Sequence, residues 1–377
     1  MSYSRFGSHR SMVFDEFRNK LYANALRKLV TPDTVVLDLG AGLGIHGLLA
    51  AAAGAKRVYL VEPEPVVQTA REIARANGLE DRIVVLEGKI EEVELPEPVD
   101  LIVSVFTGNL LYDEDLLPSL FHARDRYLKP GGKLIPDLAE LRLAPVSAPE
   151  LHAKYISRWS EPHLGLDFSS VRRFAANEVL WPSREEARSS FLLSHGVATA
   201  SLDLNTATHA DCESITRSKI ETSGICHGLL GWIRIQLDEH WLSTSPTDPE
   251  VHWGNAFLPI DPPVPLEQGE EVELDLRRPA YGDWVWSIKA ASGTRIHSSF
   301  FGRCDGMRRL RSIAPDHLPG LGQKGEQVLH VLEWMKQGLS IQEIAHRLAR
   351  TGASGYLDME DALRQVQSLA LRYANVR

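Results

Sequence analysis

The sequence predicts three regions in chain order: an α/β domain with a doubly wound parallel sheet, a mostly β domain, and a short helical end. The first prediction rests on residues 35–64, VVLDLGAGLGIHGLLAAAAGAKRVYLVEPE, where two apolar strands flank a glycine-rich turn and a helix. The second rests on short alternating segments after Pro136 with turn residues between them. The third rests on apolar residues at helical spacing after residue 320.

The composition is that of an ordinary globular protein of 377 residues, long enough for two or three domains. A net charge of -9 argues against a general nucleic-acid binder. No apolar run reaches 18 residues, and the N-terminus is polar, so neither a membrane span nor a signal peptide is expected. The three scattered cysteines, Cys212, Cys226 and Cys304, indicate a reducing compartment, the cytoplasm, without a disulfide framework or a zinc site.

The elements of the α/β region follow one another closely. Residues 10–30 are expected to form one amphipathic helix with Met12, Phe14, Phe17, Leu21 and Leu26 on one side. Apolar strands are expected to end at Asp38 and at Glu62, and Lys129-Pro-Gly-Gly is expected to be a turn. Further strands are predicted in RIVVLE, VDLIVS and KLIP, and helices over residues 66–76 and 115–127.

The second region reads as a series of short strands: LRLAPV, VATASLDL, GLLGWIRIQL, NAFLPI, EVELDL and WVWSIKA. Residues 151–190 interrupt this pattern with a more helical, charged stretch. In the last region the apolar stripe comprises Val328, Leu329, Val331, Leu332 and Met335. A new helix is predicted to start at Ser340 with Glu343 as its capping box, and a final one to run from about 358 to 374.

The glycine loop gives the first functional indication. Its order is Asp38-x-Gly40-x-Gly42-x-Gly44, and Ile45 stands where a dinucleotide fingerprint has its last glycine. This spacing resembles the S-adenosylmethionine (SAM) loop of class I methyltransferases. Glu62 follows Gly42 by twenty residues, where a carboxylate accepts hydrogen bonds from ribose hydroxyls. The alternative is a nucleotide-fold turn that binds another ligand.

Three further stretches, at residues 2–26, 88–137 and 243–253, together resemble the protein arginine methyltransferase family. The resemblance covers roughly residues 2–300 and implies a Rossmann-like SAM domain joined through Pro136 to a β-barrel. It also implies a helical arm, about Trp159 to Glu178, that makes a homodimer; the alternative is an ordinary surface excursion. The domains expected are 1–30 (helical lid), 31–137 (SAM domain), 138–318 (barrel, arm at about 155–185) and 319–377 (helical).

The resemblance implies a cofactor-binding set of His9, Met12, Arg18, Asp38, Gly40, Gly42, Gly44, Glu62, Lys89, Ile90 and Glu91. Arg18 matches the arginine that pairs with the SAM carboxylate, which a guanidinium can do bidentately. Met12 matches a methionine near the sulfur, and residues 89–91 match the segment that frames adenine. Taken alone, Met12 would be a core helix residue and Arg18 a solvated charge.

The catalytic residues expected from the resemblance are Glu114, His252 and Asp15. We expect Asp15 and His252 to lie within hydrogen-bonding range, with the pair fixing the imidazole tautomer and keeping it partly charged. The family carries two glutamates after the fourth strand, and both face the substrate guanidinium. Here the second is Glu114, whereas the first is Val105, and Asn109 stands where many relatives have an aromatic residue.

Because the departures surround the acceptor pocket, the sequence predicts methyl transfer to a nitrogen or oxygen of a protein, peptide or small molecule. Two alternatives remain: an arginine N-methyltransferase that uses Glu114 alone, and a silent SAM-binding scaffold. Glu114 or His252 is the candidate general base for an amine or imidazole acceptor.

The helical end allows three interpretations: a DNA-binding helix-turn-helix, a peptide-recognition module of the PqqD-like kind, and a plain helical cap or dimer contact. Residues 320–377 hold seven Lys/Arg and six Asp/Glu, so they are nearly neutral, which disfavours DNA binding.

Overall fold

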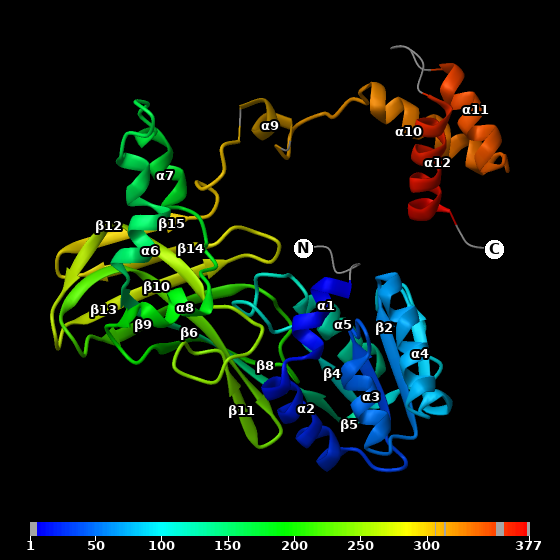
Figure 1. Cartoon of the computed structure of the whole chain (residues 1–377), viewed down its shortest axis with the longest axis horizontal. Coiled ribbons are helices and arrows are strands. Elements are labelled where there is room, and N and C mark those ends of the chain that lie inside the picture. The colour runs from blue at the N-terminus through cyan, green and yellow to red at the C-terminus, as the bar shows by residue number, and fades with distance from the viewer. Residues whose placement is uncertain (1–5, 306, 313, 352–357, 375–377) are drawn as a thin grey trace. The chain divides into compact units, whose positions relative to one another are not determined.

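The computed structural model describes residues 6–305, 307–312, 314–351 and 358–374; residues 1–5 of the predicted lid lie outside these ranges. The chain divides into two compact units, Met1–Cys304 and Asp305–Arg377. In the first unit, the N-terminal helices precede a parallel sheet, and an antiparallel region follows it (Figure 1). Among the described residues, no helix is long and apolar enough to cross a membrane.

The N-terminal segment forms two helices, α1 (Phe6–Val13) and α2 (Glu16–Leu29), so the single helix predicted over 10–30 is wrong. The break comes at Asp15, whose side chain accepts from the backbone N–H of Arg18 and caps α2. The predicted apolar side is wrong as well, since Phe14 is 74% exposed. The buried side of α2 instead carries Arg18, Asn19 and Tyr22.

The first domain is a five-stranded parallel sheet in the order β3-β2-β1-β4-β5. Its strands are β1 (Val35–Leu39), β2 (Arg57–Glu62), β3 (Ile83–Glu87), β4 (Val99–Ser104) and β5 (Leu128–Ile135). Its helices are α3 (Ile45–Ala52), α4 (Gln68–Ala76) and α5 (Leu117–Tyr127). The carboxyl ends of β1, β2 and β4 meet at one edge, where doubly wound sheets bind ligands.

Two details differ from the predicted elements. Strand β1 continues one residue past Asp38 to Leu39. The expected turn at Lys129 lies inside β5, where pairing shifts from Val99–Leu128 to Leu101–Lys133 and the intervening residues bulge out.

The barrel-like domain consists of two antiparallel sheets. The first contains β6 (Leu138–Ser147), β7 (Phe191–Leu192), β8 (Val197–Asp203), β10 (Gly224–Leu237), β11 (His240–Ser243) and β12 (Ala256–Leu266). The second contains β9 (Cys212–Lys219), β13 (Glu271–Arg278), β14 (Val285–Ala290) and β15 (Gly293–Ser298). The helical segment between β6 and β7 comprises α6 (Pro149–Tyr155), α7 (Arg172–Ala175) and α8 (Arg184–Ser189), with 3₁₀ turns at Ser157–Ser160 and Ser169–Val171. Figure 1 shows α7 projecting from the barrel strands.

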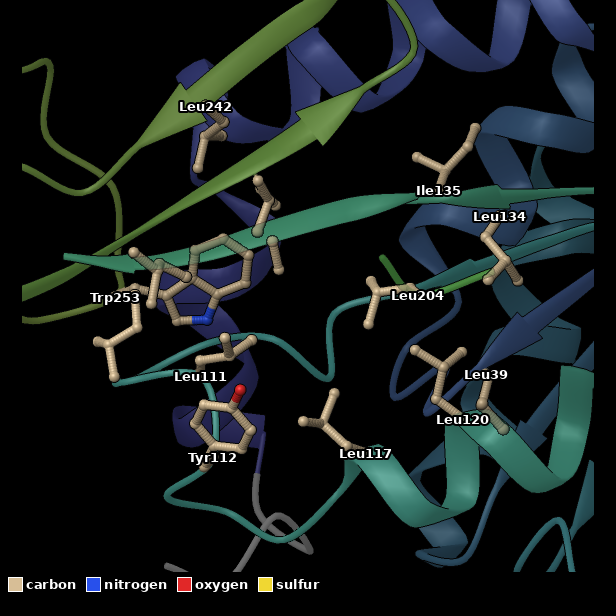
Figure 2. Close-up of a cluster of buried hydrophobic side chains, with 14 of the residues drawn as sticks. Leu39, Leu111, Tyr112, Leu117, Leu120, Leu134, Ile135, Leu204, Leu242 and Trp253 are labelled. Carbon is tan, nitrogen blue, oxygen red and sulfur yellow. The ribbon is translucent and has the colours of Figure 1, made fainter. Parts of the chain in front are cut away.

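One apolar core joins the parallel sheet to the barrel. Figure 2 shows Leu111 and Tyr112, from the loop after β4, beside Trp253 of a barrel loop. Leu39 and Leu134 of the parallel sheet belong to the same cluster. The loop after β4, which carries Val105, Asn109 and Glu114, is therefore packed between the two domains.

The second unit contains α9 (Met307–Ser312), α10 (Gln323–Lys336), α11 (Ile341–Thr351) and α12 (Met359–Tyr373). Its core includes Val331, Ile344 and Leu348. The predicted capping box is confirmed, because Ser340 N–H donates to Glu343 and Glu343 N–H donates to Ser340 Oγ.

Candidate active site

The glycine loop turns sharply between β1 and α3. Gly40, Gly42 and Gly44 have φ values of +73°, +54° and +81°, a left-handed conformation that glycine adopts without steric cost. Asp38 Oδ2 accepts a hydrogen bond of 2.7 Å from Gly47 N–H at the start of α3. Glu62 accepts from Gly42 N–H and from Glu64 N–H, both at 3.0 Å. Both predicted carboxylates therefore hold the loop through its backbone.

Burial changes the protonation of these two acids. It raises the pKa of Asp38 to about 7, with the Glu62 charge adding to the effect and the Gly47 hydrogen bond opposing it. Burial also raises the pKa of Glu62, although two backbone N–H groups oppose the shift. A positively charged ligand would favour the ionised form of both groups.

The Arg18 guanidinium is buried against the end of α1. Its Nη2 donates to Met12 O at 2.7 Å and to Asn19 Oδ1 at 3.0 Å. Its Nη1 lies 3.4 Å from His252 Nε2, and its ring neighbour is Trp253, with the guanidinium carbon 5.3 Å from the ring centre. A buried cation fixed by this many contacts costs little further ordering when it binds a carboxylate.

Asp15 and His252 join α2 to the barrel loop, as predicted. Asp15 Oδ2 accepts from His252 N–H and lies 2.9 Å from His252 Nδ1. Burial raises the pKa of Asp15, but hydrogen bonds from His252 and Arg18 outweigh it, and the pKa falls below its ordinary value. The imidazole therefore uses Nδ1 as its donor.

The predicted partial charge on His252 is wrong. Burial and the nearby Arg18 charge lower the pKa of His252, and the opposing effect of Asp15 is smaller. A neutral ring with a proton on Nδ1 leaves Nε2 as an acceptor, and Nε2 faces Arg18.

The segment predicted to frame adenine follows β3, which pairs with β2 up to Glu62. Ile90 is buried there, whereas Lys89 and Glu91 are exposed. Glu91 Oε1 accepts a 2.5 Å hydrogen bond from Ser119 Oγ. His9 lies against the glycine loop, where a Cβ added to Gly42 would meet His9 Nδ1 at 2.9 Å.

The loop after β4, residues 105–116, is called the acceptor loop here, and its backbone is strained. Asn109, Leu110 and Leu111 have φ values of +42°, +57° and +62°, which disfavours non-glycine residues by about 1–2 kcal/mol each. Asn109 Nδ2 donates to Glu114 Oε1 at 2.8 Å, and Asn109 Oδ1 accepts a long bond of 3.4 Å from Gly254 N–H. Asn109 thus links the predicted catalytic glutamate to the loop that holds His252.

The two acids beside Glu114 bind side chains of the barrel domain. Asp115 forms two 2.7 Å bonds with Arg278, and Asp113 accepts from Trp284 Nε1 at 2.8 Å. Val105 is half-buried and packs against the main core. Glu114 differs from these two acids in the partners described for it: its carboxylate accepts from Asn109, and its charge acts to raise the pKa of His252.

The sequence identifies Asn109 only as a departure from the family and not as the partner of Glu114, although asparagine tolerates left-handed backbone. Other residues that shape the site are missed altogether. Asn19 and Tyr22 have no recognisable signal in the sequence. The structure shows their roles: Asn19 accepts from Arg18, and Tyr22 OH donates to Ser104 O at 3.0 Å. His46 is also buried, 4.3 Å from the Tyr22 ring, and burial lowers its pKa well below the ordinary value.

The comparisons agree with this geometry. Residues 36–132 match the model of a methyltransferase domain, and residues 137–280 match that of the arginine methyltransferase oligomerization subdomain. Protein arginine N-methyltransferase 6 of Xenopus tropicalis is 34% identical over 288 residues, 73% of this chain and 84% of the relative. Protein arginine N-methyltransferase 1.1 of Arabidopsis thaliana is 34% identical over 280 residues, 72% of this chain and 71% of the relative.

A solved structure shares the fold over most of its length. The Trypanosoma brucei PRMT1 enzyme-prozyme heterotetrameric complex with AdoHcy matches with a TM-score of 0.71 and 27% identity, over 79% of this chain and 99% of that one. The residues around the glycine loop could hold such a cofactor, because a buried guanidinium can pair with a carboxylate and a carboxylate such as Glu62 can accept from ribose hydroxyls. The chain therefore belongs to the protein arginine methyltransferase family and is a SAM-dependent methyltransferase.

Proposed function

We propose that the protein is an arginine N-methyltransferase that holds its acceptor with a single carboxylate, Glu114. The observation that carries the proposal is the arrangement of the acceptor loop. Asp113 and Asp115 bind Trp284 and Arg278, whereas Glu114 is fixed by Asn109 near His252. The relatives named as arginine N-methyltransferases support the choice of acceptor.

The protein's main task in this reaction is to align the acceptor nitrogen with the methyl group. SAM supplies an activated methyl group on a sulfonium. In the proposal, Glu114 accepts hydrogen bonds from the substrate guanidinium and directs one nitrogen at the methyl carbon. As the nitrogen–carbon bond forms and the carbon–sulfur bond breaks, the guanidinium loses a proton, which Glu114 takes and passes to solvent.

Asp15 and His252 act as positioning residues in this proposal. The neutral His252 ring turns Nε2 toward Arg18, and Asp15 holds Nδ1, so the pair orients the guanidinium that binds the cofactor carboxylate. We therefore assign the proton to Glu114 and not to His252.

Val105 favours a second candidate, methylation of another nitrogen such as an imidazole or amine. A guanidinium between two carboxylates is polarised on both sides, and valine can neither accept a hydrogen bond nor carry charge. Methylation of an imidazole or amine requires only one carboxylate in the site.

The deciding experiment uses labelled SAM and three peptides that differ only in one residue, Arg, Lys or His. Transfer to the Arg peptide, located by tandem mass spectrometry, supports the proposal; transfer to Lys or His alone supports the second candidate. SAM binding by calorimetry without transfer to any peptide or lysate protein would indicate a silent scaffold.

A substitution sharpens the result. Val105→Glu should raise kcat/KM for the Arg peptide by about 10–100-fold by restoring the second carboxylate. Val105→Gln, of similar size but neutral, is the matched control and should give no such gain.

We also propose that the segment between β6 and β7 makes a homodimer, in the cytoplasm. It exposes apolar side chains, with Leu164 88% and Leu166 60% exposed, beside a cavity of about 490 Å³ that Trp159 and Phe168 line. Arg172 fixes this segment to the barrel through two bonds to Asp261, at 2.9 and 2.7 Å. Light scattering should give a dimer for the native chain and a monomer for a Leu164→Asp/Leu166→Asp variant.

A further inference from the structure

A second cavity lies against the barrel strands, and its lining contains no residue of the glycine loop. It has a volume of about 420 Å³, and its lining includes Phe17 of α2, Arg142 of β6, Arg234 and Trp232 of β10, and Trp241 of β11. Nothing in the methyl-transfer chemistry above uses these side chains. They nevertheless form a concave, aromatic and cationic site.

Strand register explains why these residues meet. Arg142 pairs with Trp232 and Arg234 pairs with Ser243, so their side chains share one face of the sheet. The alternate residues, such as Ile233 and Leu242, face the apolar core. The arginines and tryptophans of the cavity therefore stand on paired strands, and the loop before His252 completes its lining.

The charges in the cavity are unequal. Glu140 Oε2 accepts from Arg142 at 2.9 Å and from Arg234 at 3.4 Å, so one carboxylate serves two guanidinium groups. Arg234 stacks 4.6 Å from the Trp241 ring centre, and its Nε and Nη2 have no hydrogen-bond partner among the described residues. In a chain of net charge -9, this is a local excess of positive charge.

The lining itself contains one acid, Asp248. Asp248 belongs to the loop before His252, and its carbonyl oxygen accepts from Arg184 at 2.7 Å and from Arg188 at 3.5 Å. These two bonds involve the backbone and leave the Asp248 carboxylate as one negative charge in the lining. The free donors of Arg234 remain, and a negatively charged group is their natural complement.

Two lining residues of the cavity are close in sequence to residues of the candidate site. Phe17 precedes Arg18, which contacts His252, and Pro249 of the lining stands three residues before His252. The cavity and the candidate site are therefore linked through α2 and through the loop that holds His252.

We propose that this cavity is a subsite for a carboxylate on the acceptor peptide, held by Arg234 and Arg142 while Trp241 packs on its methylene groups. The inference rests on the proposed peptide acceptor. A glutamate or aspartate side chain and a free C-terminal carboxylate share this chemistry. The site predicts a preference for acidic sequence near the methylated residue.

The test uses Arg peptides in which one Glu is moved through the flanking positions, each matched by a Gln peptide and amidated at the C-terminus. One register of Glu should lower KM about tenfold against Gln, with kcat unchanged, and added salt should reduce the gain. A free C-terminus in place of the amide distinguishes the second source of carboxylate.

Arg234→Met should remove the preference and leave the rate on the Gln peptide unchanged. Arg217→Met, an exposed arginine on β9, is the matched control and should keep the preference. Equal rates on all Glu and Gln peptides in the native enzyme, or equal losses for both peptides in Arg234→Met, would overturn the proposal.

Binding is measured separately, so that failure of the proposed function does not decide the result. Tryptophan fluorescence should change more with the Glu peptide than with the Gln peptide, and Trp241→Phe should reduce the difference. If SAM binds but no peptide is methylated, the proposed acceptor is wrong, while this titration still supports the subsite or, with identical curves, refutes it.

Discussion

The cofactor side and the acceptor side of the active site are held together by different means. On the cofactor side, Asp38 and Glu62 bind backbone N–H groups of a loop whose left-handed positions are all glycine. On the acceptor side, Asn109, Leu110 and Leu111 adopt left-handed backbone without glycine, and a side-chain amide fixes Glu114. The first loop is relaxed, whereas the second stores strain.

This difference predicts which side of the site tolerates substitution of its residues. The donors on the cofactor side are backbone N–H groups, so the loop keeps its geometry if residues other than its glycines, Asp38 and Glu62 vary. The acceptor loop depends on particular side chains, including Tyr112 and Trp253 in the apolar junction and Arg278 on Asp115. Substitutions should therefore affect the two sides independently.

The largest effect is expected on the acceptor side. Glu114→Gln should lower kcat/KM by about 1,000-fold, because the amide cannot pair with a guanidinium or take its proton. The dissociation constant of SAM, measured by calorimetry, should stay within about twofold. Asp113→Asn is the control in the same loop and should retain most activity; an equal loss there would show that Glu114 has no special role.

The next effect belongs to the cofactor side. Arg18→Lys should weaken SAM binding by about 30–100-fold, since an ammonium cannot reproduce the planar contacts to Met12 O and Asn19. Lys20→Gln, on the exposed side of the same helix, should not change the affinity. Calorimetry on both variants checks this, and an unchanged affinity in Arg18→Lys would remove Arg18 from the cofactor site.

A smaller effect should show the strain in the acceptor loop. Asn109→Gly removes the hydrogen bond to Glu114 but suits left-handed backbone, so kcat/KM should fall about tenfold without loss of thermal stability. Asn109→Ala removes the bond and keeps the strain, so it should lower both activity and melting temperature. Identical melting temperatures for the two variants would argue against strain at this position.

The smallest effect is a pH dependence of cofactor affinity. The pKa of Asp38 is raised to about 7, and a cationic ligand favours the ionised form, so binding below pH 7 releases a proton. SAM affinity should rise by up to about tenfold per pH unit between pH 6 and 7 and level off above. Asp38→Asn should flatten this part of the curve, whereas Asp33→Asn, an exposed acid, should not; parallel curves would contradict the assignment.

Much of the fold follows from local sequence. The glycine loop and the alternation of strands and helices determine the parallel sheet, and Ser340 with Glu343 marks a helix start correctly. The N-terminal helix was mispredicted, because the apolar spacing of Met12, Phe14 and Phe17 suggested a buried stripe. Tertiary contacts override that pattern, because Arg18 and Asn19 are buried instead. The Arg18 guanidinium donates to the Asn19 side chain, and both side chains donate to Met12 O.

The site was less predictable where long-range contacts decide it. The Asp15–His252 bond could be expected from the family resemblance, but the neutral state of His252 depends on burial and on Arg18, which sequence does not give. The same holds for Asp113 and Asp115, whose partners Trp284 and Arg278 lie more than 160 residues away. Only the folded barrel shows that these acids are unavailable to the acceptor.

The Asp15 carboxylate has a consequence for synthesis of the chain. It caps α2 locally, yet its other oxygen binds His252, which lies 237 residues later. During translation, α2 emerges long before the barrel loop, so this bond forms only after most of the first unit has left the ribosome. The predicted cover of the cofactor site is thus translated first, and its contact with the barrel is completed late.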